Sequence, residues 1–127
     1  MIEYEVIPDT NIIEFVIEGK ATKDELVPLL DATNAVIAEH GKVRMLKQIR
    51  GPALVTIELS AFWENLRWGF KNLKNIERVA GVADQEWIGK ITKIVDPLFS
   101  AEMCFFPTAE IDAARAWLRE PATPETD

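Results

Sequence analysis

Alternating apolar and polar positions along the chain predict five β-strands. Residues 3–7 form a short first strand, turn residues follow at positions 8–11, and the β-branched run at residues 12–18 completes an antiparallel hairpin. The apolar stretch Val79-Ala80-Gly81-Val82 is typical of a strand that is covered on both faces. The other strands are predicted at residues 43–49, 76–83 and 101–106.

Four helices are expected between and after these strands. Thr22 and Glu25 have the spacing of a capping box, so Thr22 is predicted as the N-cap of a first helix that ends at Gly41. Pro28 lies past the first turn and is expected to kink this helix or to delay its start. A second helix is predicted at about residues 60–74, a third after the N-cap Asp84 and a fourth after the N-cap Thr108.

The resulting element order is β-β-α-β-α-β-α-β-α, which predicts the α/β class. Strands that alternate with helices favour right-handed crossovers, and hence a mainly parallel five-stranded sheet with one antiparallel edge strand. The length of 127 residues fits a single domain, predicted at residues 1–119. Residues 120–127 are rich in Pro, Thr and Glu and are expected to form a disordered tail.

Composition limits the function classes. The net charge of −7 argues against general binding to the phosphate backbone of nucleic acids. No apolar run is long enough to span a membrane, and the acidic N-terminus lacks the basic stretch of a signal peptide. A single Cys cannot form an internal disulfide, which agrees with a reducing compartment. We therefore expect a cytoplasmic protein with no integral membrane association.

Basic residues are concentrated in the middle of the chain. Residues 41–93 contain ten basic and five acidic residues, whereas both flanking regions are strongly acidic. Two interpretations are open: the solvated flank of a helix together with the exposed face of a strand, or a docking patch for an acidic partner. The basic residues include Lys42, Arg44, Lys47, Arg50, Arg67, Lys71, Lys74 and Arg78.

Motifs for catalysis or cofactor binding are not found in the sequence. There is no glycine-rich phosphate loop, and one His with one Cys cannot supply the four ligands of a structural zinc site. His40 is expected to favour the dipole at the end of the first helix, and Cys104 is expected to be a buried, inert thiol. We expect no enzyme activity, no cofactor and no metal.

The second predicted helix carries the clearest candidate surface. At about 100° per residue, Trp63, Leu66 and Phe70 fall on one apolar stripe that is predicted to face the core. Trp68 lies almost opposite, and a Trp on a polar face is a common interface anchor. The alternative is that other parts of the chain cover Trp68, or that the helix is rotated. The predicted interface consists of Trp68, Asn65, Asn72, Arg67 and Lys71.

Ser60, at the start of this helix, has two interpretations. Its hydroxyl is suited to cap the helix N-terminus, and a phosphate group at the same position would be tolerated by the helix dipole.

The chain resembles the SpoIIAA-like proteins. The resemblance covers roughly residues 3–119 and is carried by Phe62-Trp63-Glu64-Asn65-Leu66, Phe70-Lys71-Asn72-Leu73, residues 76–82 with Trp87, and residues 113–118. It implies the fold of the anti-sigma-factor antagonist (STAS) domains, with a looser similarity to CRAL-TRIO lipid-binding domains. It also implies a regulatory phosphoserine in a turn of the type Asp-Ser-Ser-Gly-Leu, where this chain has Glu58-Leu59-Ser60-Ala61-Phe62.

Three function classes follow from these features. The first is a non-enzymatic regulatory module of STAS type that acts through protein–protein contacts, with a homodimer as one form of such contact. The second is a carrier of a small apolar ligand such as a lipid, in a pocket lined by Phe70, Trp87 and Ile91. The third is an enzyme that uses carboxylates or Thr. A cavity beneath the second and third helices favours the carrier, and a closed core with an apolar surface patch favours the module.

Overall fold

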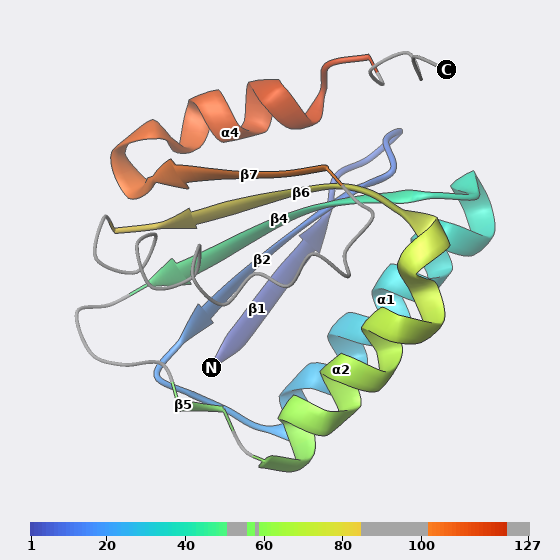
Figure 1. The fold of residues 1–127 in the computed structure, drawn as a ribbon, viewed down its shortest axis with the longest axis vertical. Coiled ribbons are helices and arrows are strands. Elements are labelled where there is room, and N and C mark those ends of the chain that lie inside the picture. The colour runs from blue at the N-terminus through green and yellow to red at the C-terminus, as the bar shows by residue number, and fades with distance from the viewer. Residues whose placement is uncertain (51–55, 58, 85–101, 122–127) are drawn as a thin grey trace.

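A five-stranded sheet forms the centre of the computed structural model, which describes residues 1–50, 56–57, 59–84 and 102–121. The strand order is β1-β2-β4-β6-β7; β1 and β2 are antiparallel and the other neighbours are parallel. The predicted α/β class, with a mainly parallel sheet and one antiparallel edge, is confirmed (Figure 1). The strands are β1 (Ile2–Val6), β2 (Ile12–Glu18), β4 (Val43–Arg50), β6 (Ile76–Ala83) and β7 (Glu102–Pro107).

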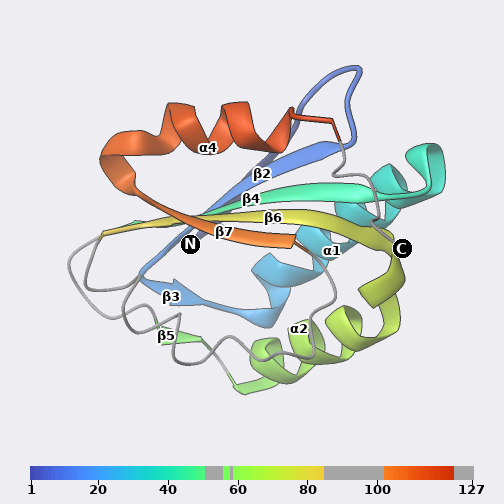
Figure 2. The same cartoon turned by 45° about the horizontal axis from the view of Figure 1, so that its top comes forward.

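Helices cover both faces of this sheet. Helices α1 (Lys23–His40) and α2 (Leu59–Asn72) lie on one face, and α4 (Ile111–Leu118) lies on the other (Figures 1 and 2). Short 3-10 helices follow α2 and precede α4, at Leu73–Asn75 and Thr108–Glu110. No helix within the described ranges has the length and apolar character needed to cross a membrane. The third helix, predicted between the N-cap Asp84 and Pro97, falls within residues 85–101, which lie outside the described residues.

A second, two-stranded sheet was not predicted from the sequence. Strand β3 (Lys20–Ala21) pairs in parallel with β5 (Thr56–Ile57) beside the main sheet. Segments of two residues are too short to show any alternation of polarity, so periodicity cannot identify them.

Helix α1 begins and ends where its caps predict. The Thr22 side chain accepts a hydrogen bond from the Glu25 backbone N–H at 3.3 Å, and the Glu25 carboxylate accepts one from the Thr22 N–H, which completes the capping box. Gly41 ends the helix in the left-handed conformation at φ 83°. The helix begins at Lys23 and includes Pro28, so the expected delay of its start was wrong. The capping box supplies hydrogen-bond partners to the N-terminal backbone N–H groups, so the helix can begin before Pro28.

The N-terminal cap of α4 also differs from the prediction. Thr108 lies in the 3-10 turn, and the N-cap position belongs to Glu110, which makes no side-chain capping bond. The turn itself brings the chain from β7 into the helix, so no Ser or Thr cap is required there.

Two hydrophobic cores separate the layers. Adjacent residues on the central strands are buried on opposite sides: Ile13 packs beneath α1 and α2, whereas Ile12 packs beneath α4. Coverage on both faces explains the nearly continuous apolar pattern of β6.

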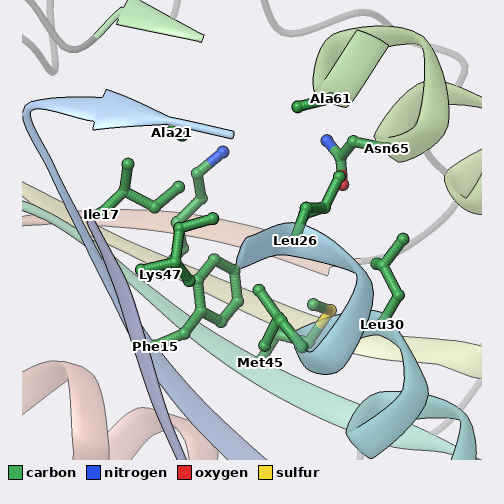
Figure 3. Close-up of a pocket in the computed structure, with 11 residues that line it drawn as sticks. Phe15, Ile17, Ala21, Leu26, Leu30, Met45, Lys47, Ala61 and Asn65 are labelled. Atoms are coloured by element: carbon green, nitrogen blue, oxygen red, sulfur yellow. The ribbon is translucent and has the colours of Figure 1, made fainter. Parts of the chain in front are cut away.

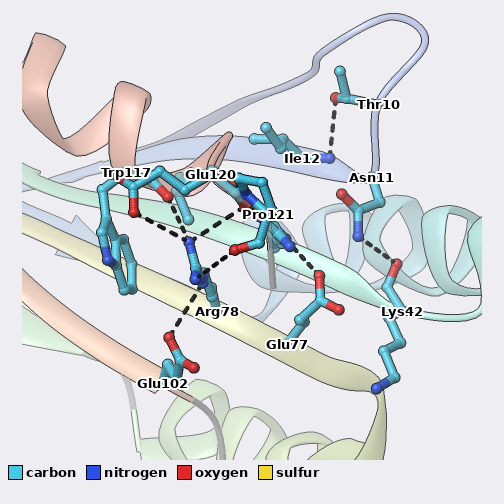
Figure 4. A network of polar contacts seen from close by, with 12 residues as sticks. Thr10, Asn11, Ile12, Lys42, Glu77, Arg78, Glu102, Trp117, Glu120 and Pro121 are labelled. Carbon is cyan, nitrogen blue, oxygen red and sulfur yellow. Dashed lines mark hydrogen bonds and ion pairs between the residues drawn. The ribbon is translucent and has the colours of Figure 1, made fainter. Parts of the chain in front are cut away.

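Two buried arginines hold the C-terminus of α4. Arg44 of β4 and Arg78 of β6 are register neighbours, 9% and 3% exposed. Arg44 donates hydrogen bonds to the Leu118 and Glu120 carbonyls and pairs with Glu77. The Leu118 carbonyl belongs to the group that a helix C-terminus leaves without internal partners, and Glu120 lies just beyond the helix end. The two arginines thus act as a cap supplied by the sheet, and Figure 4 shows the contacts of Arg78.

Arg78 makes the wider set of contacts. Its guanidinium donates to the Trp117 carbonyl at 2.8 Å and to the Pro121 carbonyl at 3.1 Å, and it pairs with Glu102 at 3.2 Å. The group also lies 5.0 Å from the centroid of the Trp117 ring, within cation–π range. Glu120 and Pro121, which the sequence assigned to the tail, are held here; residues 122–127 lie outside the described residues.

Arg44 and Arg78 therefore do not belong to a surface patch. Both interpretations of the basic middle region placed them at the surface, and both were wrong for these two residues, because the second helical layer buries this face of the sheet.

We expect Arg78→Met to lower the free energy of unfolding by about 3 kcal/mol, because it removes a buried cation and leaves carbonyls and a carboxylate without their donor. Arg67→Met is the matched control: Arg67 is exposed and, among the described residues, pairs with Glu64 one turn away on the same helix, so a change below about 0.5 kcal/mol is expected. Urea unfolding of both variants measures the difference. Equal effects would show that the arginine cap contributes nothing to stability.

Candidate functional site

Helix α2 is rotated by about half a turn from the predicted orientation. Ala61 is 1% exposed, and Trp68 packs against the core beneath α1 and α2. The Trp68 indole Nε1–H donates a hydrogen bond to Asn34 Oδ1 of α1 at 2.7 Å. Trp63 and Phe70, predicted to be core, are each 54% exposed. The predicted core stripe was therefore wrong, because the side of α2 that carries Ala61 and Trp68 packs inward.

The outward side of α2 carries an apolar stripe. Leu59, Trp63 and Phe70 fall within about 40° of one another at 100° per residue, and they are 70%, 54% and 54% exposed. Arg67 and Lys71 are exposed on the flank of the stripe. We refer to Leu59, Trp63 and Phe70, with these two cations, as the outer face of α2.

The five residues predicted as an interface do not share one surface. Trp68 points inward, and Asn72 donates to the Trp68 carbonyl at 3.0 Å near the helix end. Asn65 lines a cavity beneath the helix. Arg67 and Lys71 alone lie on the outer face. A helical projection places residues correctly relative to one another, but it does not show which side faces the sheet.

A small apolar cavity of about 60 Å³ lies between the sheet, α1 and α2 (Figure 3). Its wall combines side chains of β2 and β4 with the N-terminal parts of the two helices, at Leu26 and Ala61. One basic side chain, Lys47 of β4, enters this apolar lining. The other lining residues are Ile2, Phe15, Ile17, Ala21, Leu29, Leu30, Met45 and Asn65.

The position of Lys47 follows from strand alternation. Val43 and Met45 of β4 pack on the α1 and α2 side of the sheet, so Lys47 projects to that side as well. The Lys47 side chain is partly buried. The surrounding protein desolvates its amine, and this desolvation lowers the pKa of Lys47. Among the described residues, no hydrogen bond or ion pair reaches its amine. The sequence showed Lys47 only as one member of the basic middle region.

The remaining candidates are dispersed. Ser60 is exposed in the first turn of α2 rather than before it, and His40 lies in the last turn of α1 as predicted. Cys104 is only partly buried on β7, so the expectation of a buried thiol was wrong. Of the predicted carrier pocket, Phe70 points outward, and Trp87 and Ile91 lie outside the described residues.

Known proteins share this architecture. The model of the SpoIIAA-like family matches residues 12–119. Among solved structures, the chain is similar to an uncharacterised protein of the DUF3478 family with a SpoIIAA-like fold from Shewanella loihica PV-4. That likeness has a TM-score of 0.71 at 22% identity and covers 93% of this chain and 92% of the other. A search of curated proteins gives no match.

We expect Trp68→Ala to lower the free energy of unfolding by about 3 kcal/mol, because it removes the indole ring that packs against the core beneath α1 and α2. Trp63→Ala, on the same helix, should change stability by less than about 1 kcal/mol, since its ring is more than half exposed. Urea denaturation of both variants tests the rotation of α2. The opposite ranking would restore the orientation predicted from the sequence.

We expect Lys47→Met to raise the free energy of unfolding at pH 7 by about 1 kcal/mol, because Met keeps an unbranched stem and removes a desolvated charge. The pKa of Lys47 in the folded chain lies below its ordinary value of 10.5, so the unfolded chain binds more protons and this penalty decreases as the pH rises. The difference in unfolding free energy between Lys47→Met and the original protein therefore has its largest value below the folded-state pKa of Lys47, and it vanishes above about pH 10.5.

Urea unfolding of both proteins at pH 7 and at pH 10.5 measures this difference. The other titrating groups are the same in both proteins, so their contributions to the pH dependence cancel. A difference of constant size at the two pH values would show that the charge of Lys47 has no cost in the folded state.

Proposed function

Because this chain belongs to the SpoIIAA-like family, we propose that it is a non-enzymatic regulatory module of STAS type that acts through protein–protein contacts at the outer face of α2. The single observation that carries the proposal is the outward orientation of Leu59, Trp63 and Phe70 on one side of one helix. The proposed module works in the cytoplasm and needs no cofactor.

The energetic support comes from the size of these side chains. A large aromatic ring that remains more than half exposed keeps much of its burial free energy for a binding event. Interfaces are typically anchored by a few such residues, with Trp among the most frequent, and a central anchor contributes about 2 kcal/mol or more. Trp63 and Phe70 are two turns apart on α2, a spacing suited to a helix or strand laid along the stripe.

The charge of the outer face favours an acidic partner. Arg67 and Lys71 flank the stripe, and Lys74 continues the positive charge into the following 3-10 helix. Acidic residues on a partner would meet these cations at the rim of the contact and accelerate encounter. A second copy of the chain, with a net charge of −7, is one such acidic partner.

Site-specific photocrosslinking tests this proposal. A benzoylphenylalanine at position 63 or 70, expressed in the source cells, should give discrete crosslinked products. The same residue at position 112 should give none, since Asp112 is exposed on α4, on the opposite side of the sheet. Lys71→Glu should reduce the yield at position 63 several-fold by reversing a rim charge.

Sedimentation of the purified protein, with and without Phe70→Ser, determines whether the crosslinked species is a second copy. Equal crosslinking at positions 63 and 112, or a yield at position 63 that Lys71→Glu leaves unchanged, would contradict a contact at the outer face of α2.

A further inference from the structure

We propose that the cavity beneath α1 and α2 is a binding site for a small monocarboxylate with a short apolar tail, whose carboxylate pairs with the Lys47 ammonium. This site is separate from the outer face of α2 and does not depend on the protein contacts proposed for that face.

The position of the cavity in the fold suits a ligand. Ile17 and Lys47 lie towards the carboxyl ends of the parallel strands β2 and β4, and the first turns of α1 and α2 form the opposite wall. In open α/β sheets, ligands typically bind at this end of the strands. The N-termini of both helices also carry partial positive charge, which favours an anion over a cation nearby.

The composition of the wall defines the ligand class. Phe15, Leu26 and Leu30 supply an apolar surface that suits a hydrocarbon chain (Figure 3). Lys47 supplies a single positive charge, and the Asn65 side chain at the α2 wall adds one polar group that can donate to an oxygen. One charge and few polar groups within an apolar lining are the usual design of a pocket for an amphipathic small molecule.

The size of the cavity restricts the ligand further. About 60 Å³ is far below the roughly 300 Å³ at which pockets for drug-sized ligands begin. A lipid-length chain therefore does not fit the cavity in this structure, whereas a short carboxylic acid matches it in scale. A phosphate group is less suitable, because its charge calls for several donor groups and the lining offers two, Lys47 and Asn65.

The lysine itself is costly to keep at this position without a ligand. Its amine contacts no hydrogen-bonding or charged partner among the residues described, although the wall around it is apolar. A bound carboxylate would supply a charge-assisted hydrogen bond, worth more than a neutral one in this environment. Residues that reduce stability are typical of sites kept for function.

Titration with butyrate, followed by 15N-edited NMR of the full chain, tests the proposal, with butyramide as the neutral ligand of similar shape. Butyrate should bind about tenfold more tightly than butyramide and shift the resonances of Phe15, Lys47 and Asn65. Acetate should bind more weakly than butyrate, because it lacks the apolar tail. Lys47→Met should abolish the preference for butyrate, while Lys42→Met, at an exposed lysine, should retain it.

The spectrum of Lys47→Met also shows whether the variant is folded, so a loss of binding is attributable to the missing charge. Equal affinity for butyrate and butyramide would overturn the proposal, as would a preference that survives Lys47→Met, shifts confined to exposed lysines, or no binding at all. Crosslinking at the outer face of α2 is independent of each of these results.

Discussion

The hydrogen bond from the Trp68 indole to Asn34 fixes the rotation of α2, and the features proposed as functional depend on that rotation. The indole N–H donates to the Asn34 side chain on α1 at 2.7 Å, while the Trp68 ring packs against the core beneath α1 and α2. With Trp68 turned towards α1, Ala61 and Asn65 face the sheet and line the cavity. Trp63 and Phe70 then face outward. A half-turn of the helix would bury the outer face and remove Asn65 from the cavity.

The opposite layer depends on a different constraint, the need of a short helix for partners at its C-terminus. Helix α4 has eight residues, and Arg44 and Arg78 of the sheet supply donors to the carbonyls of its last turn and of the residues that follow. Arg115 adds a paired contact to Glu14 of β2 at 3.1 Å. Basic residues close together in the sequence thus serve three purposes: capping α4 from within the sheet, placing a charge in the cavity, and flanking the outer face of α2.

Much of the fold could be predicted from the sequence, because it depends on local patterns. The capping box of Thr22 and Glu25, the left-handed Gly41 and the continuous apolar run of β6 each have one simple structural interpretation. The main sheet followed from the alternation of strands and helices. The pairing of β3 with β5 could not be predicted, since it joins segments of two residues each.

The candidate sites could not be predicted, because they depend on contacts between distant residues. Trp68 lies among polar neighbours on a helical projection, and its acceptor is 34 residues away in the sequence. Lys47 lies on the same face of β4 as Val43 and Met45, but a charged residue in a strand is usually exposed, and the sequence does not show that helices cover both faces of this sheet. Periodicity identifies the faces of an element, whereas tertiary packing decides which face is buried.

The measurement that tests the orientation of α2 most directly is a nuclear Overhauser experiment on the indole N–H protons of the folded chain. The structure predicts cross-peaks from the Trp68 indole N–H to the side chain of Asn34 on α1. Cross-peaks from Trp63 to α1, with none from Trp68, would show that the apolar stripe packs inward. In that case neither the outer face of α2 nor the cavity at Lys47 would exist as described.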